Sequence, residues 1–202
     1  MYKKYFKRLL DIIISLILII FLSPIMILIF FLVWFTIGFP IFRHKRPGFN
    51  NKIFTLYKFK TLYDPLKNIS ENKRRNKVGN FLRKTGLDEL PQLFNILENN
   101  MSFVGPRPLL IKYLKIKAFK KHKRNKCKPG VTGLAQIHIF NDLIIKRRSS
   151  KWEEQFILDK KYYRDLSFKL DMIILIRTFL KTLKSNKIDY YKETKLLAKY
   201  IK

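Results

Sequence analysis

The chain has 202 residues with 43 Lys and Arg against 14 Asp and Glu, which gives a formal net charge of +29. Hydrophobic residues make up 48% of the sequence, enough to bury a core, and this excludes a wholly disordered chain. A single cysteine excludes an internal disulfide and favours a reducing compartment. The positive charge indicates an anionic partner, for which nucleic acid, lipid headgroups and a phosphorylated substrate are the candidates.

The first predicted element is a membrane segment, because residues 12–42 contain no formal charge over 31 positions. A straight helix of this length would extend about 46 Å, beyond the roughly 30 Å of a bilayer's hydrocarbon core. Ser23 and Pro24 near its middle predict a bend. Lys and Arg flank both ends, so the positive-inside rule places both in the cytoplasm, as in a re-entrant segment. A tilted single span with a proline kink fits the residues equally well.

The segments that follow predict a small domain. Residues 53–60 are rich in aromatic and β-branched side chains and predict a strand, with Lys58 and Lys60 on one face. Residues 64–77 predict a polar loop. From residue 87 onward, apolar positions follow helical spacing beside a polar stripe, which predicts an amphipathic helix with one solvent-exposed face. The stripe consists of Asp88, Gln92, Asn95 and Asn99.

Two segments rich in proline and glycine predict loops. Residues 104–108 (VGPRP) cannot continue a helix, and residues 129–136 (PGVTGLAQ) predict another turn. Between them, residues 112–128 contain nine Lys or Arg and no acid, which predicts a basic helix followed by a loop. Residues 166–184 predict a further amphipathic helix, which would lie either on lipid or in the core.

The candidate for chemistry is an adjacent acid pair, Asp88 and Glu89, in a strongly basic chain. Thr85 and Asp88 match a capping box, and on spacing alone the interpretation of Asp88 as a helix cap is favoured. The same position also suits phosphate chemistry, because free N–H groups at a helix start attract anions. Two carboxylates there could hold Mg²⁺, which proteins usually bind through one or two carboxylates together with substrate phosphates.

Two arginines are candidate phosphate ligands near this pair. Arg83 precedes Asp88 by five residues, and Arg107 lies in the rigid VGPRP loop. A planar guanidinium can bind two phosphate oxygens at once, although a solvated charge is the alternative for either residue alone. The three histidines lack metal-ligand spacing, and no Walker A, dinucleotide-binding or nucleophile-elbow motif occurs. A membrane anchor, two acids and fixed cations indicate a phosphorylated substrate at a lipid surface.

These motifs resemble the bacterial sugar transferases, also called monotopic phosphoglycosyl transferases, over residues 2–184. The combination of LDELPQLFN with MSFVGPRP is the most specific part. Within the family, the chain is most similar to the small single-domain members that transfer diacetylbacillosamine phosphate in N-glycan assembly. The matching stretches are RPG at 46–48, IFTLYKFKTL at 53–62, LRKTGLDELPQLFNIL at 82–97, MSFVGPRPLL at 101–110, PGVTGLAQ at 129–136 and the stretch around 152–171.

The resemblance implies an α+β, mostly helical protein. Residues 1–42 would form a re-entrant membrane helix broken at Ser23-Pro24. Residues 43–184 would form a membrane-associated catalytic domain with a short strand element and interfacial amphipathic helices, followed by a basic tail at 185–202. The expected location is the cytoplasmic face of a bacterial inner membrane. The implied partners are a UDP-sugar, undecaprenyl phosphate and anionic lipids rather than nucleic acid, and a homodimer stays open.

The resemblance also implies a reaction, in which a sugar 1-phosphate passes from a UDP-sugar to undecaprenyl phosphate in the first membrane step of glycoconjugate assembly. Asp88 would be the nucleophile, forming a phosphosugar-aspartyl intermediate with release of UMP. Glu89 would assist catalysis, and Asp88 and Glu89 would hold Mg²⁺. The cations expected to bind the substrate phosphates are Arg107, Arg83, Lys58 and Lys60.

Two departures from the family pattern favour a second hypothesis, a catalytically weakened membrane-bound scaffold. Asn99 and Asn100 stand where the family usually has G-D, so one acid is missing. Residues 138–140 read HIF in place of the usual N-G-R, and an insertion follows them, which leaves the sugar donor undefined. Nucleic-acid binding is a third and weaker hypothesis, because a basic run such as 112–128 beside a membrane domain suits lipid headgroups better.

Overall fold

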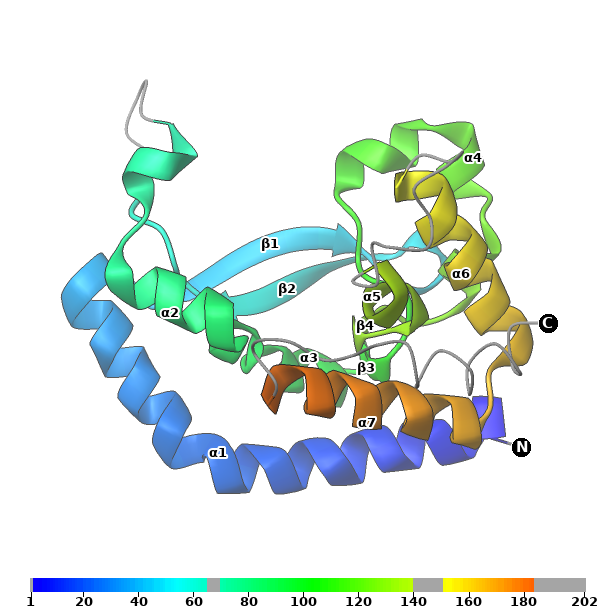
Figure 1. Ribbon diagram of the computed structural model, residues 1–202, viewed down its shortest axis with the longest axis horizontal. Helices are drawn as coiled ribbons and strands as arrows, with labels where there is room; N and C mark the ends of the chain where they lie inside the picture. The colour runs from blue at the N-terminus through cyan, green and yellow to red at the C-terminus, as the bar shows by residue number, and fades with distance from the viewer. Residues whose placement is uncertain (1, 65–69, 140–150, 184–202) are drawn as a thin grey trace.

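A computed structural model describes residues 2–64, 70–139 and 151–183, and within them a mostly helical α+β protein (Figure 1). The helices are α1 Lys7–Ile37, α2 Lys77–Thr85, α3 Gln92–Leu97, α4 Lys117–Lys120, α5 Leu134–Ile139, α6 Lys151–Asp165 and α7 Phe168–Leu183. The strands are β1 Ile41–Pro47, β2 Ile53–Phe59, β3 Ser102–Val104 and β4 Gly130–Thr132. Short π- or 3₁₀-helical turns are η1 Tyr2–Phe6, η2 Phe49–Asn51, η3 Glu71–Arg74, η4 Leu87–Glu89, η5 Ile111–Lys115 and η6 Lys123–Lys126.

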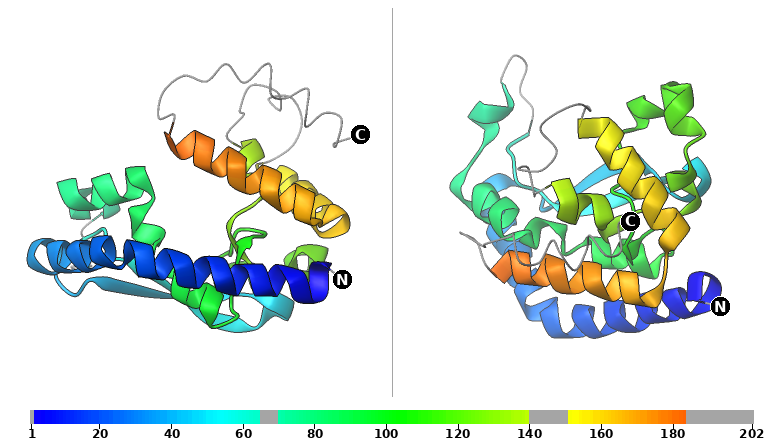
Figure 2. Two further views of the ribbon diagram at one scale, coloured as in Figure 1. Left: turned by 90° about the horizontal axis from the view of Figure 1, so that it is seen from below. Right: turned by 45° about the vertical axis from the view of Figure 1, so that its right-hand side comes forward.

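The long helix α1 bends near its middle (Figures 1 and 2). Within the described ranges it alone is long and apolar enough to cross a membrane, with a mean hydropathy of 3.2. Pro24 lies inside it, and the Ser23 hydroxyl donates to the carbonyl of Ile20 at 2.8 Å. Both features loosen the helical backbone. The bend predicted at Ser23-Pro24 is present. The helix is not broken there, however, because α1 continues from Lys7 to Ile37.

One stripe of α1 packs on the rest of the protein, and the remaining surface is exposed. Phe21 and Phe35, for example, are 76% and 84% exposed. An apolar surface of this extent is typical of contact with lipid. The stripe repeats at about four-residue intervals, which places its members on one face of the helix. Its buried residues are Asp11, Ser15, Ile29, Val33 and Ile37.

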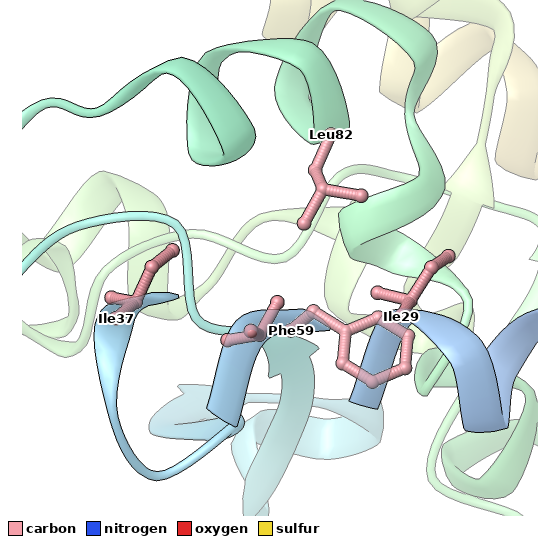
Figure 3. Close-up of a cluster of buried hydrophobic side chains, with 5 residues drawn as sticks. Ile29, Ile37, Phe59 and Leu82 are labelled. Carbon is pink, nitrogen blue, oxygen red and sulfur yellow. The ribbon is translucent and has the colours of Figure 1, made fainter. Parts of the chain in front are cut away.

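The C-terminal half of α1 packs on the β1–β2 hairpin and on α2. Figure 3 shows Ile29 and Ile37 of α1 gathered with Phe59 of β2 and Leu82 of α2. Val33 completes this cluster of buried hydrophobic side chains. The membrane helix therefore shares a core with the strand that carries Lys58 and with the helix that carries Arg83.

The strand predicted at residues 53–60 is present as β2. It pairs antiparallel with β1 in a register that runs from Ile41 opposite Phe59 to Pro47 opposite Ile53. β1 has no counterpart among the predicted elements, because it begins inside the apolar run and continues into charged residues.

The solvent-exposed polar stripe predicted on the helix after residue 87 is wrong. Gln92 and Asn95 of α3 are only 3% and 0% exposed, whereas the apolar Phe94 is 43% exposed. The Asn95 amide donates to the Thr55 carbonyl at 2.8 Å and accepts from the Tyr57 N–H at 2.9 Å. A buried amide that bonds a strand edge replaces a missing strand partner. This contact fixes α3 against β2.

The segments predicted as loops at 104–108 and 129–136 are partly strand. β3 and β4 pair in parallel, with Ser102 opposite Gly130 and Val104 opposite Thr132. The turn predicted at 129–136 is therefore wrong, because the segment forms β4 and then enters α5. The basic helix predicted within 112–128 is present only as the four-residue α4, between the 3₁₀ turns η5 and η6.

The helix α7 joins the N-terminal end of α1 to the core around β3. Ile174 is fully buried with Val104 and Tyr162, whereas Ile176 and Phe179 are 58% and 64% exposed. The core alternative predicted for this helix therefore describes its buried face, and contact of its exposed face with lipid stays a prediction. Asp171 of α7 ties α1 to this region through an ion pair with Lys7 at 2.5 Å.

Candidate active site

Asp88 and Glu89 lie on the short turn η4, between α2 and α3. α2 ends at Thr85, and Gly86 follows with a φ of 74°, a left-handed conformation that glycine adopts at little cost. The Thr85 hydroxyl bonds back into α2, at 2.9 Å from the carbonyl of Phe81. No side-chain cap is found at the start of η4 or of α3. The capping interpretation of Asp88 is therefore wrong.

Cations from two distant segments surround the acid pair. The Lys58 ammonium of β2 lies 2.5 Å from a carboxylate oxygen of Glu89 and 3.7 Å from one of Asp88. The Arg107 guanidinium, from the loop after β3, lies 3.7 Å from the same Glu89 oxygen. Asp88 itself is only 8% exposed. Four of the predicted site residues thus meet at one place, although they come from three separate parts of the sequence.

The electrostatics of Asp88 differ from those of an ordinary surface carboxylate. Burial raises the pKa of Asp88 above its usual value, and the neighbouring charge of Glu89 adds to the rise. Lys58 and Arg83 lower the same pKa and so oppose this effect. A buried carboxylate with a perturbed pKa and specific cationic neighbours is typical of a functional site.

The other two predicted cations lie at the edge of this arrangement. Arg83 donates from Nε to the hydroxyl of Thr61 at 2.8 Å, and its charge lowers the pKa of Asp88. The Lys60 ammonium pairs with Asp64 at 2.7 Å. Lys58 and Arg107 therefore lie within 4 Å of the acid pair, whereas the contacts described for Arg83 and Lys60 are with Thr61 and Asp64.

Arg46 is a further cation at the site that the sequence did not single out. Both burial and the charge of Arg107 lower the pKa of Arg46. Its Nε is buried and has no hydrogen-bond acceptor in the described part of the chain. Two guanidinium groups that repel one another, one with a buried unpaired donor, favour an anion between them. The RPG stretch at 46–48 was a signal for this residue, but spacing could not place it near Arg107.

An apolar groove of about 450 Å³ lies between α1, the hairpin and α3. Its walls include Ser23 and Met26 near the bend of α1 and Phe94 of α3. Pro91, two residues after Glu89, lines the same groove. The membrane helix and the segment that carries the acid pair therefore border one apolar recess.

One of the departures from the family pattern, Asn100, lies at the opposite end of α3 from the acid pair. Asn100 follows the C-terminal end of α3, where its amide donates to Glu98 at 3.0 Å, whereas Asp88 precedes the N-terminal end of α3. The acid missing at position 100 is therefore separated from Asp88 by the whole of α3. The side chains of residues 138–140 and the insertion after them lie outside the described residues.

Comparison with known proteins identifies the family. Residues 2–185 match the family described as bacterial sugar transferase. The chain belongs to the bacterial sugar transferase family. The "Uncharacterized sugar transferase EpsL" of Bacillus subtilis (strain 168) is 40% identical over 188 residues, which cover 91% of this chain and 90% of EpsL.

Two relatives have names that specify a reaction. The "UDP-glucose:undecaprenyl-phosphate glucose-1-phosphate transferase" of Klebsiella pneumoniae is 39% identical over 191 residues, or 87% of this chain and 40% of that protein. The "Undecaprenyl-phosphate galactose phosphotransferase" of Salmonella typhimurium is 32% identical over 196 residues, with the same two coverages of 87% and 40%. The chain therefore spans nearly all of EpsL but less than half of either of these larger proteins.

Proposed function

We propose that this protein transfers a sugar 1-phosphate from a UDP-sugar to undecaprenyl phosphate at the cytoplasmic face of the bacterial inner membrane. The observation that carries the proposal is the buried Asp88 beside Glu89, with Lys58 and Arg107 within 4 Å of the pair. The names of the Klebsiella and Salmonella relatives support undecaprenyl phosphate as the acceptor.

The proposed reaction has two displacements at one phosphorus atom. In the first, a carboxylate oxygen of Asp88 attacks the phosphate that bears the sugar, and the bond to the second phosphate breaks. UMP leaves with the bonding electron pair, and the sugar phosphate stays on Asp88 as an acyl phosphate. In the second, an oxygen of undecaprenyl phosphate attacks the same phosphorus and releases the Asp88 carboxylate. Covalent catalysis of this kind divides one difficult transfer into two easier steps.

The cations serve this chemistry by offsetting negative charge. A carboxylate that attacks a diphosphate meets charge repulsion, which fixed positive groups reduce most strongly in a site from which water is excluded. Lys58 and Arg107 hold the two acids, and Arg46 supplies a buried donor beside Arg107. We assign these three residues to the diphosphate, and Arg83 and Lys60 to its edge.

Asp88 and Glu89 are the residues that would hold Mg²⁺. They offer neighbouring carboxylate oxygens, and Mg²⁺ in proteins commonly takes one or two carboxylates together with substrate phosphates. No group of three or more metal-ligating side chains occurs in the part of the chain that the structure describes, so the substrate would supply the remaining ligands. When bound, the ion neutralises part of the diphosphate charge.

The apolar groove suits the hydrocarbon chain of the acceptor. It runs beside the bend of α1 and reaches Pro91, close in sequence to the acid pair. A lipid that enters from the bilayer would keep its chain against apolar side chains while its phosphate approaches the cations. Burial of such a chain is favourable by about 0.8 kcal/mol for each CH₂ group.

The bend and the flanking charges support a re-entrant topology for α1, and labelling tests it. Cysteines introduced at residues 2 and 45 of a Cys127→Ser chain should both react only from the cytoplasmic side. In the same chain Pro24→Ala should favour a straighter helix and expose one end to the periplasm. Labelling of either position from the periplasm without the Pro24 change would contradict the re-entrant arrangement.

A UMP-release assay tests the function itself. The full chain in detergent micelles, with Mg²⁺, undecaprenyl phosphate and a panel of UDP-sugars, should release UMP from at least one donor. Initial rates should follow ping-pong kinetics, because UMP departs before the acceptor reacts. Intersecting lines typical of a ternary complex would contradict the covalent intermediate. Absence of turnover with every donor, with binding to anionic vesicles retained, would instead favour the scaffold hypothesis.

A further inference from the structure

Arg124 is a buried cation within a run of exposed lysines. Of the nine basic residues in 112–128, seven are exposed and Lys128 is half-buried, whereas Arg124 is only 5% exposed. Removing a guanidinium from water is costly unless the charge is paired and its donors are bonded. The position of Arg124 therefore requires an explanation other than attraction to lipid headgroups.

The contacts of Arg124 join α6 to the loop that carries Arg107. Nε lies 2.9 Å from a carboxylate oxygen of Asp159 in α6, and the two side chains are 5% and 2% exposed. The guanidinium also lies over the ring of Phe156, 5.4 Å from its centre. Nη2 donates to the backbone carbonyl of Arg107 at 2.6 Å. One buried guanidinium thus connects a carboxylate on a helix to the backbone of a residue at the acid pair.

The Arg107 loop depends on such contacts, because it contains no helix or strand of its own. On its N-terminal side, the N–H of Gly130 donates to the carbonyl of Pro106 at 3.1 Å. At Arg107 itself, the carbonyl is held by Arg124. The Arg107 side chain is 53% exposed, so packing does little to fix it. The position of the Arg107 guanidinium beside Glu89 therefore depends mainly on the contacts that hold the Arg107 backbone.

We propose that Arg124 and Asp159 are positioning residues that fix Arg107 for phosphate binding, an inference that rests on the proposed transfer function. Arg124 does not itself bind the substrate in this scheme, because it is buried and its charge is matched by Asp159. Asp159 acts one step further away by orienting the guanidinium. Burial raises the pKa of Asp159 to about 6, and the charge of Arg124 opposes this rise, so the pair is ionised at neutral pH.

A double-mutant cycle distinguishes positioning from a general role in folding. Arg124→Lys keeps a positive charge for Asp159, but an ammonium lacks the planar fork that contacts Asp159 and the Arg107 carbonyl together. With Arg107 present, Arg124→Lys should lower kcat/KM for UMP release by about 10- to 100-fold, the range caused by small misplacements of catalytic groups. In an Arg107→Ala chain the same change should cost less than about threefold, because the positioned side chain is gone. Asp159→Asn should follow the same pattern.

A matched control uses another buried ion pair, that of Lys7 and Asp171 at 2.5 Å. Lys7→Gln should lower the midpoint of thermal unfolding and reduce kcat/KM by the same factor with and without the Arg107 side chain. Where Arg107→Ala leaves too little turnover, UDP binding measured by calorimetry gives the same cycle. Equal losses from Arg124→Lys in both chains, or no loss with Arg107 present, would overturn the positioning role. Absence of turnover by the unchanged chain would contradict the proposed function and this inference with it.

Discussion

Asp88 and Asp171 are both buried carboxylates in a basic protein, but their surroundings differ. Asp171, 2% exposed, accepts hydrogen bonds from Lys7 at 2.5 Å, from Tyr2 at 2.6 Å and from Tyr162 at 2.8 Å. Asp88, 8% exposed, has the Lys58 ammonium 3.7 Å from a carboxylate oxygen, a longer ion pair than the 2.5 Å pair of Asp171 with Lys7.

This difference separates an acid that stabilises the fold from one that is available to react. Native proteins normally satisfy buried polar groups, and Asp171 follows that rule with three donors. Asp88 is also buried, but its ion pair with Lys58 is longer, and burial raises the pKa of its carboxylate. A carboxylate in a longer ion pair is bound less tightly and can offer oxygen lone pairs to a metal ion or to phosphorus. Such local departures from stability are expected at functional sites.

The largest expected effect is on catalysis by Asp88→Asn, which removes the nucleophile. UMP release should fall by about 10³-fold or more, as when a catalytic nucleophile is lost in other enzymes. The matched control is Asp165→Asn, which removes a carboxylate whose partner Arg164 is exposed, and it should change the rate by less than about twofold. A UMP-release rate for Asp88→Asn within about tenfold of that of the unchanged chain would contradict the proposal that Asp88 reacts whereas Asp171 stabilises the fold.

The second effect concerns the cation nearest the acid pair. Lys58→Met should lower kcat/KM by about 10²-fold, because a fixed positive group at the reacting phosphate is lost. Lys60→Met should cost several-fold less, since the Lys60 ammonium pairs with Asp64 at the edge of the site. Steady-state UMP release measures both variants. Equal losses of kcat/KM in the two variants would contradict the claim that Lys58 acts through its contact with the acid pair.

The third effect concerns stability at Asp171. Asp171→Asn leaves the Lys7 ammonium without its anionic partner and weakens two tyrosine hydrogen bonds, so the fold should lose roughly 1–3 kcal/mol. Thermal unfolding of the detergent-solubilised protein should show the loss as a lower midpoint. Tyr2→Phe, which removes one of the three bonds, should cost less. An unchanged midpoint for Asp171→Asn would contradict the stabilising role of this acid.

The smallest effect has the opposite sign. Because burial raises the pKa of Asp88, its stabilising contribution is present at low pH and is lost as pH rises through the folded-state pKa. At neutral pH the ionised carboxylate therefore costs stability, and the neutral amide of Asp88→Asn should raise the unfolding midpoint by up to about 4 °C. The measurement is made without divalent cations. A clear decrease in the unfolding midpoint of Asp88→Asn would show that Asp88, like Asp171, stabilises the fold.

Local signals in the sequence were enough to predict several features of the fold and the site. The uncharged run and its Ser-Pro pair predicted α1 and its bend, and the aromatic and β-branched composition of residues 53–60 predicted β2. The acid pair and the rigid loop of Arg107 predicted phosphate chemistry, and the resemblance to the family implied Lys58 as a further cation of the site. Each of these features depends on residues that are close together in the chain.

Features that depend on distant partners could not be predicted. β3 and β4 have three residues each and exist because they pair across 28 positions, from Ser102 to Gly130. Asn95 and Arg124 are polar, and their sequence neighbours predict a solvent-exposed stripe for Asn95 and a basic surface run for Arg124. Their burial becomes favourable only once β2 and α6 supply hydrogen-bond and charge partners.

The most direct measurement of the central claim is mass spectrometry of the intact enzyme after incubation with its UDP-sugar donor and no acceptor. The spectrum should show a mass increase equal to one sugar phosphate, and peptide mapping should place it on Asp88. Addition of undecaprenyl phosphate should then remove the adduct. Turnover without any adduct on Asp88, under conditions that trap an acyl phosphate, would contradict the covalent role of this residue.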